Sequence, residues 1–154
     1  MTAAIVELKN ISHRFDKVQV LSEVSLTIAS GSYTVLLGPS GSGKTTLLSI
    51  LGCIMQPTSG TLKIAGQNVA GLTAEELAKI RRDHIGFIFQ SYNLFPTLNA
   101  IENVRIALDV RGISGYAATS RAEDVLRDVG LGHRLTNYSG NLSGGEQQRV
   151  AVAR

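Results

Sequence analysis

Residues 38–45 read GPSGSGKT and fit the pattern G-x-x-x-x-G-K-[ST]. A β-rich run, SYTVLL at 32–37, comes directly before them, and a helix-forming run, TLLSIL at 46–51, follows. This pattern between a strand and a helix is typical of phosphate binding, because glycines let the backbone curl and point successive N–H groups inward. The helix N-terminus adds its partial positive charge. The stretch therefore predicts an α/β fold with a nucleotide phosphate site at this loop.

Two side chains of the loop carry the expected chemistry. Lys44 is placed to reach the β- and γ-phosphates of a nucleotide, and the hydroxyl of Thr45 is placed to bind Mg²⁺. We therefore expect Lys44 to contact the phosphates of a bound nucleotide and Thr45 to be a metal ligand. An ordinary Gly/Ser turn is the alternative, and the flanking strand and helix disfavour it.

The composition excludes several other classes of function. The chain has 154 residues, 44% of them hydrophobic and 18% charged, which suits a globular domain with a core. A net charge of +3, with only a short basic cluster at 79–82, does not indicate a nucleic-acid surface. No run approaches the 18 apolar residues of a membrane helix. The single cysteine, Cys53, is expected to be buried, and the three histidines are expected to be surface or loop residues.

Several further elements follow from local patterns. Residues 5–8, 26–28 and 61–65 are expected to be strands, and residues 99–111 and 116–129 to be helices. Another helix is expected to begin at Thr73, where Glu76 completes a capping box. The run IGFIFQ at 85–90 suits a buried parallel strand. Gln90 would then end this strand at its C-terminal edge, where ligands of open α/β sheets bind.

A second motif, LSGGEQQR, occupies residues 142–149. Ser143 is expected to cap a last helix with Glu146, and Gly144 and Gly145 form its first turn. The free N–H groups and the dipole of such a terminus favour an anion. Taken alone, the motif is equally well explained as an ordinary capped helix.

Together the two motifs resemble the nucleotide-binding domain of ATP-binding cassette (ABC) proteins. GPSGSGKT is similar to the Walker A loop of that family, LSGGEQQR to its signature motif, and FIFQ at 87–90 to its Q-loop. Phe15, within SHRF at 12–15, falls where the family has an aromatic residue against adenine, although a core phenylalanine is an alternative. The resemblance covers residues 4–154.

The resemblance implies an α/β fold, a P-loop NTPase (ABC ATPase) core with an N-terminal β-subdomain and a helical subdomain, lacking the C-terminal part of the core. The expected domains are 1–90 (β-subdomain and P-loop core), 91–142 (helical subdomain) and 143–154 (signature motif). The implied cofactors are ATP and Mg²⁺, with Lys44 and Gln90 as catalytic residues and Thr45 and Gln90 as metal ligands. The nucleotide-binding residues are then Phe15, Gly38, Pro39, Ser40, Gly41, Ser42, Gly43, Lys44, Thr45, Thr46, Gln90, Ser143, Gly144 and Gly145.

The resemblance also implies partners and a location. Two such domains would bind two ATP molecules head to tail, with the signature residues of one against the γ-phosphate on the other. A separate transmembrane permease would dock on a face that includes Tyr92, Phe95, Pro96 and Asn103, although packing in the core of the helical subdomain explains any one of these residues equally well. No nucleic-acid partner is expected. The chain would be cytoplasmic, peripheral on the inner face of the cell membrane.

The chain departs from the family pattern after residue 154. The Walker B Asp, the catalytic Glu, the D-loop and the switch His of the family have no counterpart in these residues. We therefore expect either a fragment of a longer protein or a naturally short one, and we expect no ATP turnover by residues 1–154 alone.

Three functions remain open from the sequence. The runs at 87–94 and 97–104 look most like the macrolide-export and lipoprotein-release branch, which favours a transporter subunit. A soluble ABC ATPase acting on DNA or ribosomes is the second possibility, which the short helical segment disfavours. The third is a non-hydrolysing nucleotide-binding module.

Overall fold

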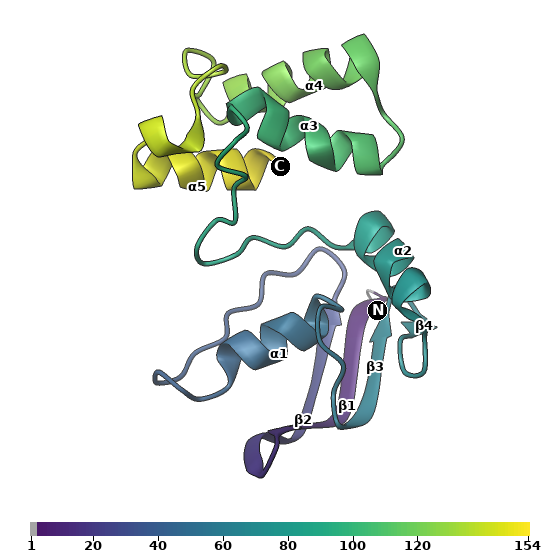
Figure 1. Cartoon of the computed structure of the whole chain (residues 1–154). Coiled ribbons are helices and arrows are strands. Elements are labelled where there is room, and N and C mark those ends of the chain that lie inside the picture. The colour runs from purple at the N-terminus through teal and green to yellow at the C-terminus, as the bar shows by residue number, and fades with distance from the viewer. Residues whose placement is uncertain (1–2) are drawn as a thin grey trace. The chain divides into compact units, whose positions relative to one another are not determined.

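The computed structural model describes residues 3–154, which form two compact units. The first unit ends at Gly86 and contains a sheet and two helices, and the second begins at Phe87 and is helical (Figure 1). Within residues 3–154, no helix is both long and apolar enough to cross a membrane. The expected domain limits at 90 and 142 stay a prediction.

The sheet of the first unit has the strand order β2-β1-β3-β4, and every neighbouring pair is antiparallel. Its strands are β1 (Ala4–Phe15), β2 (Val18–Ala29), β3 (Ser59–Ile64) and β4 (Gln67–Asn68). The central strand β1 places Leu8 opposite Leu26 on one side and opposite Leu62 on the other. The expected strands at 5–8 and 26–28 are confirmed within longer strands, and the one expected at 61–65 lies mostly in β3.

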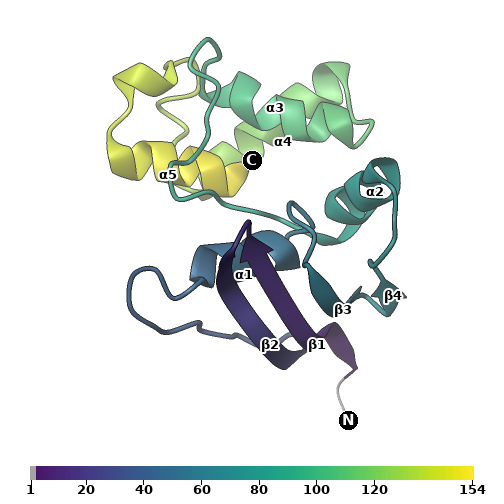
Figure 2. The same cartoon turned by 60° about the horizontal axis from the view of Figure 1, so that its bottom comes forward.

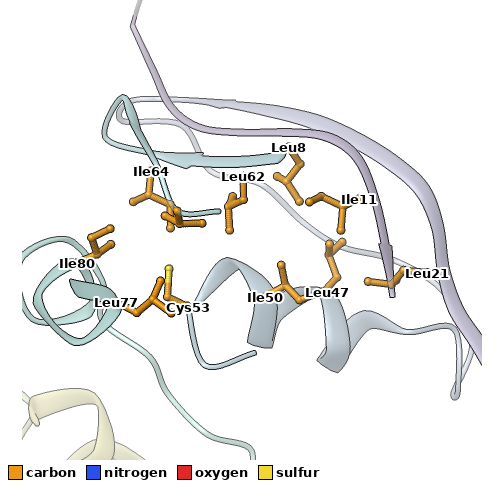
Figure 3. Packing of buried hydrophobic residues seen from close by; sticks show 11 residues of the cluster. Leu8, Ile11, Leu21, Leu47, Ile50, Cys53, Leu62, Ile64, Leu77 and Ile80 are labelled. Carbon is orange, nitrogen blue, oxygen red and sulfur yellow. The ribbon is translucent and has the colours of Figure 1, made fainter. Parts of the chain in front are cut away.

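Two helices build the core of this unit with the sheet. In α1 (Lys44–Leu51), Leu47 and Ile50 are buried, and in α2 (Ala74–His84), Leu77 and Ile80 are buried. The i, i+3 spacing gives each helix one apolar side. Figure 3 shows these side chains pointing toward Leu8, Ile11, Leu62 and Ile64 of the sheet. Cys53 is buried in the same cluster, as expected, and its burial raises the pKa of the thiol.

The second unit is a small helical bundle. It consists of α3 (Ala100–Val110), α4 (Gly115–Asp128), the 3₁₀ turn η1 (Ser139–Asn141) and α5 (Gly144–Ala153). Its core is formed by seven buried apolar side chains, Ala100, Val104, Ala122, Leu126, Leu131, Leu142 and Val150. The helices expected at 99–111, at 116–129 and after Ser143 are confirmed. All the helices after α1 except α4 begin with the capping box of a Ser, Thr or Asn residue and a Glu three residues later.

Two expected strands do not form in this structure. Residues 32–37 run from β2 toward α1 without a sheet partner, and residues 85–90 are likewise irregular (Figures 1 and 2). Tyr33 and Leu37 are 94% and 85% exposed. A parallel strand needs hydrogen-bonding neighbours, and the sheet formed by residues 3–154 offers it none. The prediction that Gln90 ends a buried strand is therefore wrong in this structure.

Candidate phosphate-binding site

Glycines shape the loop that leads into α1. Gly41 and Gly43 have φ angles of +80° and +84°, in the left-handed region that favours glycine. At Gly43 a Cβ atom would also lie 3.0 Å from the Val20 carbonyl oxygen and 2.9 Å from Cδ2 of Leu21. At Gly38 it would lie 2.8 Å from Oγ of Ser42. The spacing of these glycines is therefore what lets the loop curl tightly against β2.

The N-terminus of α1 is left open by its own sequence. Its N-cap, Gly43, has no side chain to accept a hydrogen bond, whereas Thr73, Asn99 and Ser143 cap α2, α3 and α5. The N–H of Leu47 donates to the Gly43 carbonyl at 2.8 Å. The N–H groups of residues 44–46 precede that bond, so they have no acceptor within the helix. This terminus can therefore donate to an anion.

Lys44 closes the loop from the inside. Its Nζ donates to the carbonyl oxygens of Gly38 at 2.8 Å and Pro39 at 2.6 Å, and contacts Oγ of Ser42 at 3.4 Å. These partners are neutral, and Lys44 is in none of the ion pairs found within residues 3–154. The positive charge of Lys44 is thus held at the centre of the loop and is not neutralised by a carboxylate.

The end of the β1–β2 hairpin lies beside this loop. Gly43 abuts Val20 and Leu21 of β2, and Leu21 is opposite His13 of β1. Phe15 follows two residues later on β1, and its ring contacts that of His13, with the ring centroids 4.6 Å apart. Phe15 is 47% exposed, which excludes the alternative of a core phenylalanine. An exposed aromatic ring therefore lies on the hairpin whose second strand contacts Gly43 of the loop.

The second motif forms a fully capped helix start. The N–H and Oγ of Ser143 both donate to Oε2 of Glu146, at 2.8 and 2.9 Å, and the Glu146 N–H donates back to Oγ at 3.4 Å. Arg134 donates to the other carboxylate oxygen at 3.0 Å. These bonds, chiefly the one from the Ser143 N–H, lower the pKa of Glu146 to about 2. The N–H groups of Gly144 and Gly145 still lack intrahelical acceptors.

The structure distributes the expected nucleotide-binding residues over both units. Phe15 and residues 38–46 lie together in the first unit, whereas Gln90 and residues 143–145 lie in the second. Residues 3–154 contain no cluster of His, Cys, Asp and Glu side chains that would hold a metal by itself. A metal at this site would take the Thr45 hydroxyl together with phosphate oxygens as ligands, which suits Mg²⁺.

Two expectations about single residues are wrong. His13 is not a surface residue, since only 9% of it is exposed. It is buried on β1 together with Leu8 and Ile11, and this spacing is interrupted by an irregularity in the strand near Asn10. Asn103 is not part of an exposed docking face, because it is 1% exposed and hydrogen-bonded internally. The polar residue types of His13 and Asn103 gave no indication in the sequence that either side chain is buried.

Comparisons with known proteins agree with these features. A family model described as ABC transporter matches residues 21–154. The macrolide export ATP-binding/permease protein MacB of Marinobacter nauticus is 45% identical over 97% of this chain and 24% of its own length. An uncharacterized ABC transporter ATP-binding protein of Thermotoga maritima is 45% identical over 97% of the chain and 66% of its own length.

The fold is similar to that of a solved ATP-binding cassette. The dimeric structure of MJ0796, in a post-hydrolysis state bound to ADP and Pi, superimposes with a TM-score of 0.90 at 40% identity. The match covers 96% of this chain and 67% of the solved one. The chain thus spans about a quarter of the MacB relatives and about two thirds of the shorter relatives.

Proposed function

Because the chain belongs to the ABC transporter family, we propose that it binds ATP with Mg²⁺ in the loop 38–46 and serves as the ATP-binding part of a transporter. The observation that carries this proposal is the unneutralised Lys44 ammonium inside a glycine-shaped loop at an uncapped helix N-terminus. Free N–H donors, a fixed cation and a helix dipole at one place suit a polyphosphate.

Each residue of the loop has a defined task in this proposal. The Nζ of Lys44 exchanges the Gly38 and Pro39 carbonyls for β- and γ-phosphate oxygens, because an anion is the stronger acceptor. The N–H groups from Gly41 to Thr46 donate to the phosphates, and the Thr45 hydroxyl binds the metal. Bound Mg²⁺ supplies charge neutralisation to the phosphate groups. Phe15 stacks on the base through its exposed face.

We propose that the second unit completes the site in a head-to-tail dimer. Gln90 would contact the metal and the attacking water in its own subunit. The N–H groups of Gly144 and Gly145, with the Ser143 hydroxyl, would contact the γ-phosphate held by the other subunit. The dimeric state of the MJ0796 cassette supports this arrangement, as do the unpaired donors at the start of α5.

Hydrolysis itself is proposed for the whole protein and not for residues 1–154 alone. A metal-binding Asp and a residue that positions water are parts of such sites, and residues 1–154 contain no motif that matches the family's Walker B segment. The isolated chain would then bind ATP without sustained turnover. Mg²⁺-dependent hydrolysis by residues 1–154 that is abolished in Lys44→Ala would contradict this part.

The proposed partner is a membrane permease at the inner face of the cell membrane, with export as the process. The MacB relatives are named as ATP-binding/permease proteins, and the Thermotoga relative is named as an ATP-binding protein only. Phe95 is exposed and available for docking together with Tyr92 and Pro96. Co-purification of the tagged protein with a permease supports a transporter, whereas recovery with DNA or ribosomes would favour a soluble ABC ATPase.

A binding titration tests the central part of the proposal. Calorimetric titration of the protein with Mg-ATP is expected to show saturable binding, and Lys44→Ala is expected to weaken it by about 10- to 100-fold, the size of a charged hydrogen bond. Lys63→Ala, an exposed lysine on β3, removes the same charge outside the loop and is expected to leave binding unchanged. Equal effects of the two variants would contradict a role of Lys44 in the site.

A further inference from the structure

We infer that His13 is a positioning residue that fixes the ring of Phe15 for stacking on a nucleotide base. The inference rests on the proposed function, because it takes the base to lie on Phe15. It assigns a role to a buried polar side chain that takes no part in the phosphate-binding loop. The ligand is a nucleotide with a flat aromatic base. His13 affects only the part of the binding that depends on this base.

The two rings are in direct contact. Their centroids are 4.6 Å apart and their planes meet at 77°, an edge-to-face arrangement. Aromatic pairs prefer this geometry, since the positive edge of one ring meets the negative face of the other. The inner ring, His13, is 9% exposed, and the outer ring, Phe15, is 47% exposed. The buried ring therefore supports the exposed one from inside the hairpin.

His13 itself cannot bind the nucleotide. Both of its ring nitrogens are buried and have no hydrogen-bond partner among residues 3–154. A ligand beside the hairpin cannot reach either nitrogen, so direct readout of a base or ribose by His13 is excluded. Any effect of His13 on binding must therefore pass through the ring that it touches.

The surroundings of His13 make it a rigid support. Across the β1–β2 pair it lies opposite Leu21, a core residue that also contacts the position of Gly43. The Leu21 carbonyl accepts a hydrogen bond from Nε2 of Gln19 at 2.7 Å, within β2 itself. A Phe15 ring held in one orientation loses less side-chain freedom when a base stacks on it. His13 thus links the core under the phosphate loop to the surface that would receive the base.

The substitution His13→Leu tests the inference. It replaces the imidazole by an apolar side chain of similar size. This removes the aromatic edge together with two unpartnered buried nitrogens, so the fold is not expected to lose stability. In the full chain, Mg-ATP is expected to bind about 2- to 10-fold more weakly, whereas inorganic tripolyphosphate with Mg²⁺ is expected to bind as before. His13→Phe keeps the aromatic edge and is expected to restore ATP binding.

Phe15→Ala separates this inference from the proposed function. Phe15→Ala is expected to weaken ATP binding at least as much as His13→Leu, and adding His13→Leu to it is expected to have no further effect. If Phe15→Ala weakens ATP but His13→Leu does not, or if His13→Leu also weakens tripolyphosphate, the positioning role is wrong. If Phe15→Ala leaves ATP binding unchanged, both the stacking of Phe15 on the base and the role of His13 are wrong. The proposed phosphate binding by the loop is tested separately, by Lys44→Ala.

Discussion

Asn103 holds the chain segment that enters the helical unit. Its Nδ2 donates to the carbonyl oxygens of Phe95, Leu98 and Asn99 at 3.0–3.2 Å, and its Oδ1 accepts from the Phe95 N–H at 2.8 Å. One buried amide thus bonds to several backbone groups of the segment that leads into α3. Residues 95–99 are thus held by this side chain in addition to the local turn bond from the Leu98 N–H to the Phe95 carbonyl.

Asn103→Ala is therefore expected to destabilise the protein by about 2–4 kcal/mol, since the Phe95 N–H and the Leu98 carbonyl lose the side chain to which they bond. Asn103→Asp keeps an acceptor for the Phe95 N–H but loses the donors, so it is expected to be at least as harmful. Urea unfolding of both variants measures the change. The exposed Phe95→Ala serves as a control on the same segment, and similar losses in all three variants would contradict a specific role of the Asn103 amide.

At the scale of single helices, α5 depends on an ionised cap. The pKa of Glu146 is lowered to about 2 by the Ser143 N–H and hydroxyl and by Arg134, compared with about 4.5 when unfolded. The folded state therefore gains stability from this carboxylate above about pH 5. That stability is lost as the pH falls from 4.5 toward 2, because the carboxylate is then protonated in the unfolded chain first and finally in the fold.

Glu146→Gln isolates this contribution. We expect the difference in free energy of unfolding between the protein and this variant to shrink as the pH falls from 4.5 toward 2. Other carboxylates such as Glu76 are present in both proteins, so their titration cancels in this difference. Chemical denaturation at several pH values between 6 and 2.5 measures it. A difference that does not change with pH would show that the charge of Glu146 contributes nothing.

Single elements also show what the sequence can predict. The capped helices were predictable, because Thr73 with Glu76 and Ser143 with Glu146 make their bonds within four residues of chain. The strands expected at 32–37 and 85–90 did not form, because a strand depends on partners elsewhere in the chain. The residues of both runs are apolar and have a high strand propensity. Their local pattern gives no information about which other strands would pair with them.

For the whole molecule, the candidate site was predictable only in part. The loop follows from the positions of its glycines and Lys44, which act through backbone geometry and charge over eight residues. The support beneath it was not predictable, since His13, Leu21 and Gly43 are brought together by the register of the β1–β2 hairpin. Family membership then joins Gln90 and the signature residues to this loop as a proposal.

The most direct test of the central claim is to follow backbone amide chemical shifts by NMR during titration with Mg-ATP. The account predicts the largest shifts at the N–H groups of Gly41 and residues 43–46, because these donors are unpaired before the phosphates bind, whereas the Ser42 N–H already donates to the Pro39 carbonyl at 3.3 Å. The same titration of Lys44→Ala is expected to shift them far less at equal ligand concentration. Saturable ATP binding with unshifted amides at 41–46 would contradict the account, since the phosphates would then lie elsewhere.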